Sequence, residues 1–169
     1  MKIALLWIMI PTIAAFLLSG CWRHKDIDVT GSAKYNFASL AGTTWKTKVS
    51  VALADIKRYT GEHQLNLLAP RRFDPTVPNY APVNGATVIT ILPAGTVIRI
   101  QRFVIDNGIG ADNEVKGSLE NGAYAGKEVN IDGYLLAKNR FLSPGQSSST
   151  NWDVNPETLE KVASPKYTH

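Results

Sequence analysis

The only cysteine of the chain, Cys21, is the residue best placed for covalent chemistry, because a thiol is a nucleophile. Two small residues, Ser19 and Gly20, precede it, and they follow an apolar run of sixteen residues that begins after Lys2. A basic residue, an apolar stretch and small residues in this order are typical of a cleaved export signal. As a helix the run would reach about 24 Å, short of the roughly 30 Å hydrocarbon core. We therefore expect cleavage rather than an uncleaved transmembrane anchor.

Modification of the Cys21 thiol is expected, because an unpaired cysteine in an oxidising compartment needs an explanation. The tetrapeptide Leu18-Ser19-Gly20-Cys21 resembles the lipobox of bacterial lipoproteins. The resemblance implies a diacylglycerol on the sulfur, an acylated amine and a membrane-anchored mature chain starting at Cys21. Because Trp22 stands where aspartate favours inner-membrane retention in that family, it also implies the outer membrane, facing the periplasm. Surface display and inner-membrane retention stay open as alternatives.

Other catalytic or metal-binding patterns are not visible in the sequence. The histidines His24, His63 and His169 lack the close spacing of metal ligands. The segment 106–114 is rich in carboxylates and amides but has glycine at a ligand position of the calcium-loop pattern, so a plain loop is expected. Glu128 and Asp132 are carboxylates that suit acid–base work on a glycan, but solvated surface is the simpler interpretation. We predict no catalytic residue, no metal site and no cofactor.

Four basic residues form a candidate anion-binding set. Lys46 and Lys48 alternate on one face of a predicted strand, and Arg99 and Arg102 flank a predicted irregularity in another. If the fold brings them together they suit lipopolysaccharide phosphates or peptidoglycan carboxylates; dispersed solubilising charge is the alternative. Removing Lys2 with the signal lowers the net charge from +4 to +3, too little to indicate nucleic acid.

A proline-rich segment, Pro70–Pro82, is the candidate partner-binding loop. Its four prolines restrict the chain and so lower the entropy lost on binding. It carries residue types that dominate interface energetics, namely Arg71, Arg72, Phe73 and Tyr80. The alternative is that the two aromatic side chains hold the loop against the domain.

The elements expected to position these residues are strands. Alternation of apolar and polar residues predicts a strand over Thr43–Leu53. Further strands are expected at Gln64–Ala69, Ala86–Leu92, Thr96–Ile105, Val115–Leu119 and Val129–Ile131. Leu92–Gly95 fits a type I turn that reverses the chain, and Asn121-Gly122 predicts a second hairpin. Asn155 before a proline predicts a short helix over Pro156–Ala163.

One strand changes phase in its middle. Ile98 and Ile100 lie on one face, whereas Phe103 and Ile105 lie on the other. A β-bulge at Gln101-Arg102 would turn all four toward the core. A strand buried on both faces is the alternative.

These observations predict an all-β fold, a small antiparallel barrel or sandwich with a short C-terminal helix. Residues 1–20 form the signal peptide, 21–42 a lipidated tether, and 43–169 a single β-rich domain. Residues 91–98 resemble a turn of bacterial SH3-like barrels, which often bind peptidoglycan or peptides; no binding residue transfers. We expect an outer-membrane-anchored, non-catalytic binding or assembly module for an envelope protein or polymer. The alternatives are a periplasmic inhibitor or immunity lipoprotein and, third, an envelope hydrolase.

Overall fold

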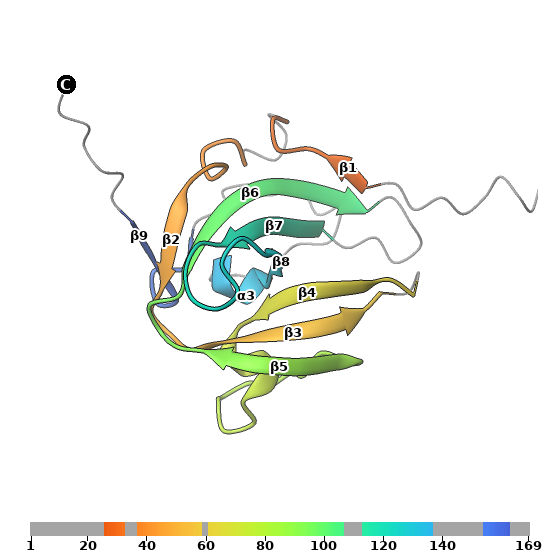
Figure 1. Cartoon of the computed structure of the whole chain (residues 1–169), viewed down its shortest axis with the longest axis vertical. Helices are drawn as coiled ribbons and strands as arrows, with labels where there is room; N and C mark the ends of the chain where they lie inside the picture. Colours follow the sequence, from red (N-terminus) through yellow and green to blue (C-terminus); the bar gives the residue numbers. More distant parts are fainter. Residues whose placement is uncertain (1–25, 33–36, 59–60, 107–112, 137–153, 163–169) are drawn as a thin grey trace, which may run out of the picture.

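The computed structural model describes residues 26–32, 37–58, 61–106, 113–136 and 154–162. Within these ranges a nine-stranded sheet and two short helices form the fold of Figure 1. The strands are β1 (Asp26–Asp28), β2 (Thr44–Thr47), β3 (Val51–Lys57), β4 (His63–Leu68), β5 (Ala86–Leu92), β6 (Val97–Asp106), β7 (Asn113–Leu119), β8 (Glu128–Ile131) and β9 (Leu159–Lys161). The helices are α2 (Pro70–Phe73) and α3 (Gly133–Leu136). The predicted all-β class is confirmed.

The sheet is mixed. Its strands are hydrogen-bonded in the order β5-β3-β4-β8-β7-β6-β2-β9, with β1 added beside β6. All pairs are antiparallel except β4 and β8, which run parallel with Asn66 opposite Asn130. The expectation of an antiparallel sheet is therefore wrong for this pair. Because β4 and β8 are parallel, both end on the same side of the sheet. The short helices that follow them, α2 and α3, therefore begin near each other.

Two local predictions around residues 43–95 are wrong. The strand expected over Thr43–Leu53 is divided by residues 48–50 into β2 and β3. The turn expected at Leu92–Gly95 does not close a hairpin, because β5 pairs with β3 whereas β6 pairs with β2. The two segments pair with each other on both sides of the interruption, with Lys46 opposite Val97 and Val51 opposite Leu92, so both are interrupted at the same level of the sheet.

The two segments bend together at a corner. The amide of Gly95 donates to the carbonyl of Thr47 (2.7 Å), and the amide of Thr47 donates to the carbonyl of Thr96 (2.9 Å). A turn is closed there by the amide of Thr96 and the carbonyl of Pro93 (3.2 Å), with a φ of 95° at Gly95 that favours glycine. The ladder therefore continues through the bend, and the sheet folds over into the two facing layers of Figure 1, with β3, β4 and β5 in one and β6 and β7 in the other.

The bulge predicted in β6 is confirmed. Its register with β7 shifts between Ile100 and Arg102, so Gln101 is the extra residue. The apolar residues on both sides of the bulge contact the main core: Ile98, Ile100, Phe103 and Ile105. The extra residue thus restores the phase of the apolar pattern.

Gly117 on β7 lies where the backbone of β6 and the side chain of Ile131 leave no room for a side chain. It lies opposite Ile100 in the register. A Cβ atom at this position would lie 2.7 Å from the carbonyl oxygen of Arg99 and 2.7 Å from Cδ1 of Ile131. The backbone carbonyl cannot move without disturbing the β6–β7 ladder, so the position requires glycine for space.

The core extends into the segment predicted as a tether. The side chain of Phe37 is completely buried and stacks on Phe103 with ring centroids 5.3 Å apart, and Leu40 is also buried. Asp26–Asp28 pairs with β6 as strand β1. The described residues between Asp26 and Gly42 therefore belong to the folded unit.

The helix predicted over Pro156–Ala163 is wrong within the described residues. Asn155 does cap a turn, since its Oδ1 accepts a hydrogen bond from the amide of Glu157 (3.0 Å). The chain then forms β9, which pairs with β2 and buries Leu159 in the core. Pairing with a sheet edge and burial of an apolar side chain outweigh the weak helix propensity of so short a segment.

Candidate functional site

The two arginines of the proline-rich segment lie against α3. The guanidinium carbon of Arg71 is 4.0 Å from the ring centroid of Tyr134, and that of Arg72 is 5.4 Å away. Arg72 also donates through Nη1 to the carbonyl of Ala81 (2.8 Å). The amide of Ala81 in turn donates to the carbonyl of Arg71 (2.8 Å). These contacts join the start of the segment to its end, so both arginines are engaged within the chain.

Asp132 anchors this arrangement, at the point where the parallel strands end. Its carboxylate accepts hydrogen bonds from the amides of Ala69 and Tyr134, each at 3.1 Å, and lies 3.7 Å from Nε of Arg72. Burial raises the pKa of Asp132, and these amides and the nearby Arg72 and Arg71 oppose the rise. The side chain is 8% exposed, so the expectation that Asp132 is solvated surface is wrong.

The two aromatic residues of the segment differ. Phe73 packs on a second apolar cluster, formed by Ala52, Ala54 and Leu68 on the face of β3 and β4 away from the main core. Tyr80 is 42% exposed. Phe73 thus holds the segment on the domain, as the alternative interpretation expected, and Tyr80 alone is presented to solvent.

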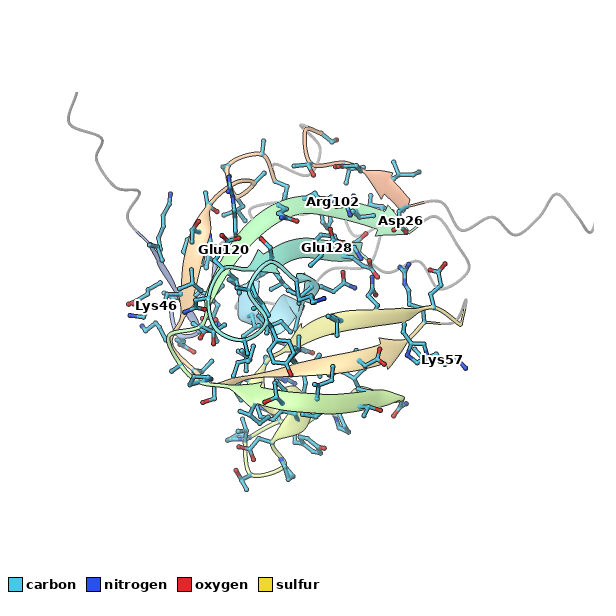
Figure 2. The ribbon with its side chains drawn as sticks, viewed as in Figure 1. Asp26, Lys46, Lys57, Arg102, Glu120 and Glu128 are labelled. Atoms are coloured by element: carbon cyan, nitrogen blue, oxygen red, sulfur yellow. The ribbon has the colours of Figure 1, made fainter. Side chains whose placement is uncertain are left out.

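Three members of the predicted anion-binding set contact polar neighbours, and two of them form ion pairs. Lys46 pairs with Glu160 (3.2 Å). Arg102 pairs with Glu128 (3.2 Å), and Figure 2 shows these two residues close together. The ammonium group of Lys48 donates to the carbonyl of Pro156 (2.7 Å). These basic side chains do not converge on one uncompensated anion site.

Arg99 differs from the other three, because its side chain has neither a hydrogen bond nor an ion pair among the described residues. Its side chain is exposed, and it forms no ion pair with any residue that the structure describes. It borders an open pocket of about 320 Å³ on the outer face of β6 and β7. The lining residues are Gly42, Arg99, Ile100, Gln101, Ser118 and Glu120.

The floor of this polar pocket is a chain of hydrogen bonds. The side-chain amide of Gln101 donates to Oγ of Ser118 (3.2 Å), and that hydroxyl donates to Oε1 of Glu120 (2.6 Å). Gln101 is the extra residue of the bulge, so the irregularity directs its side chain into the pocket. The pocket therefore offers a cation, a carboxylate and an amide on two hydrogen-bonded strands.

Ser118 and Glu120 were not predicted from the sequence. Nothing in their local pattern distinguishes them from other polar residues of a strand and its loop. The available signal was the register of the expected pairing between Thr96–Ile105 and Val115–Leu119, which places Ser118 directly opposite Arg99. That register can be fixed only when the number of extra residues in the bulge is known.

The remaining candidate chemistry is not brought together. His63 contacts Asp55 through Nδ1 (2.7 Å), and the described residues contain no group of three or more metal-ligating side chains. Cys21, His24 and His169 lie outside the described residues, as does most of the loop considered for calcium. Glu114, at the end of that loop, binds Arg58 and Lys116 instead, each at 2.7 Å.

No family model, curated protein or solved structure matches this chain. Among the helices that the structure describes, none has the length and apolar character needed to span a membrane. The predicted export signal, residues 1–20, is outside these helices.

Proposed function

We propose that this chain is a lipid-anchored, non-catalytic binding module of the bacterial outer membrane, and that it holds an envelope component in the polar pocket. The observation that carries the proposal is the exposed Arg99 guanidinium, which has no carboxylate partner among the described residues and stands beside Gln101, Ser118 and Glu120. A cation left without a partner in a concave polar surface favours binding of a ligand with an anionic group.

Binding is favoured over hydrolysis by the state of Ser118. Its hydroxyl proton is directed to Glu120, which resembles half of a nucleophile–base pair. The residue is 7% exposed, however, and the pocket lining contains no histidine. The same hydrogen bonds suffice to hold Glu120 and Gln101 in fixed positions, which is what a binding site requires.

An inhibitor or immunity lipoprotein is the second candidate function, and one observation favours it. Strand β5 is at an edge of the sheet and exposes three apolar side chains, Val88, Ile89 and Ile91, each at 45–49%. An exposed apolar edge suits a protein partner. In this case the recovered partner would be an enzyme, and the contact would not depend on Arg99.

The anchor is tested at Cys21. Cys21→Ala removes the only thiol, so we expect uncleaved precursor and no incorporation of labelled palmitate. Palmitate labelling and the mass of the mature protein in a bacterial host measure this. Cys21→Ser, which also lacks the thiol but keeps a hydroxyl of similar size, should give the same result. Equal labelling of the wild-type and alanine chains would show that the anchor is placed wrongly.

The pocket is tested by recovery of a partner from envelope extracts. We expect Arg99→Gln to recover about a tenth or less of the wild-type amount, because a charge-assisted contact is lost. Arg102→Gln is the matched control on the same strand: it loses only the exposed pair with Glu128, so recovery should stay at the wild-type level. Mass spectrometry identifies the bound material. Wild-type recovery by Arg99→Gln contradicts the proposal.

A further inference from the structure

We infer that the ligand of the polar pocket is an α-amino acid group, with its carboxylate on Arg99 and its ammonium on Glu120. This inference rests on the proposed function, since it names the chemistry that the same pocket would hold. The pocket holds two opposite charges in a small volume, and hydrogen bonds fix the orientation of one of them.

The two opposite charges are neighbours in the strand register, but they do not meet. Arg99 lies directly opposite Ser118, and the amide of Glu120 donates to the carbonyl of Val97 (2.8 Å). Arg99 and Glu120 are thus diagonal neighbours across the two strands, at positions typically about 7–8 Å apart and within reach of long side chains. They form no ion pair with each other. A ligand with both charges on adjacent groups can bridge this separation.

The carboxylate of Glu120 is oriented before a ligand arrives. Its Oε1 accepts the hydroxyl of Ser118 (2.6 Å), and Ser118 in turn accepts the amide of Gln101 (3.2 Å). The other oxygen of Glu120 and the carbonyl oxygen of Gln101 remain acceptors for an ammonium group, which has three donors and no acceptor. A neutral donor can also bind these acceptors, but only an ammonium group adds a positive charge that complements the Glu120 carboxylate.

The charge and size of the pocket exclude other anions as the preferred ligand. Glu120 would repel a phosphate or a second carboxylate, whereas it attracts the ammonium of a zwitterion. The volume of about 320 Å³ is near the lower limit for small-molecule sites. Gly42, with a φ of 78° and no atom within 4 Å of a potential Cβ, leaves one side of the pocket open. An amino acid group fits, and its side chain can extend through that side.

The test uses alanine and two derivatives that each lack one charge. Amide shifts of the isotope-labelled full chain are followed in titrations with alanine, N-acetylalanine and alaninamide. We expect alanine to move the amides of residues 99–101 and 118–120 and to bind about tenfold or more tightly than either derivative. Equal binding of N-acetylalanine and alanine overturns the inference, as does a shift confined to other residues.

Variants assign each charge to its partner. Arg99→Gln should remove the preference for alanine over alaninamide, and Glu120→Gln should remove the preference for alanine over N-acetylalanine, while Arg102→Gln leaves both preferences intact. Retention of both preferences in Arg99→Gln and Glu120→Gln overturns the inference.

If alanine does not bind but recovery of an envelope partner still depends on Arg99, the ligand class is wrong and the proposed function stands. If alanine binds as expected but Arg99→Gln recovers the partner normally, the proposed function is wrong and the ligand class stands.

Discussion

Replacing Phe103 with alanine is expected to lower the free energy of unfolding by about 3–5 kcal/mol. The side chain is completely buried directly after the bulge and stacks on Phe37. Its backbone also holds the N-terminal segment, because its amide binds the hydroxyl of Thr30 (2.9 Å) and its carbonyl accepts the amide of Val29 (3.0 Å). The cavity left by the ring would therefore loosen two parts of the fold at once.

Chemical denaturation of the Phe103→Ala variant measures this loss. Ile89→Ala on β5 is the control, because that side chain is 45% exposed and its truncation should cost roughly 1 kcal/mol or less. Limited proteolysis should also cut the Phe103→Ala chain within residues 26–42 before it cuts the sheet. Similar losses for the two variants would show that the bulge does not direct Phe103 into the core.

Removing the charge of Glu114 is expected to have an effect of comparable size. Its two carboxylate oxygens lie 2.7 Å from the Nη2 atom of Arg58 and 2.7 Å from the ammonium of Lys116. The side chains of Glu114 and Lys116 are only 10% and 6% exposed. Glu114→Gln leaves two cations in a poorly solvated place with one counter-charge fewer, which typically costs about 3–5 kcal/mol.

The matched control for Glu114→Gln is Glu128→Gln. Glu128 binds Arg102 at the surface, where both side chains are about half exposed, so its loss should cost about 1 kcal/mol or less. In addition, Glu114→Gln combined with Lys116→Met should be more stable than Glu114→Gln alone, because the buried ammonium is then absent. Thermal and denaturant unfolding provide the comparison. Equal stability of the Glu114→Gln and Glu128→Gln variants would show that burial does not strengthen the Glu114 pairs.

The parts of the fold that could be predicted from the sequence are those set by local pattern. The strand at Ala86–Leu92 agrees with β5 at both ends, and the change of phase around Gln101 located the bulge. The interruption at 48–50, the strand β9 and the parallel pairing of β4 with β8 could not be predicted. Each of these depends on a partner far along the chain, which local propensity does not encode.

The candidate site was predictable to a smaller extent. Arg99 belonged to the predicted anion-binding set of four basic residues. Which of the four is left without a polar partner depends on the groups that the fold places beside the other three. Glu160 and Glu128 neutralise Lys46 and Arg102 only after β9 and β8 have taken their places in the sheet. An uncompensated charge is a property of the assembled surface, so spacing along the chain does not show it.

The two most distant pairings of the sheet also bear on when the domain can fold. Asn66 on β4 lies opposite Asn130 on β8, and Trp45 on β2 lies opposite Lys161 on β9. Contacts of such long sequence separation slow folding, to the range of milliseconds to seconds in β-rich domains, because loop-closure entropy is lost before they form. A chain emerging from its N-terminus can complete neither pairing until β8 and then β9 have been synthesised. A chain of this topology therefore stays incompletely folded until its last strand has been synthesised, and such a delay would suit the export that we propose, because a secretion channel passes chains that have not yet folded.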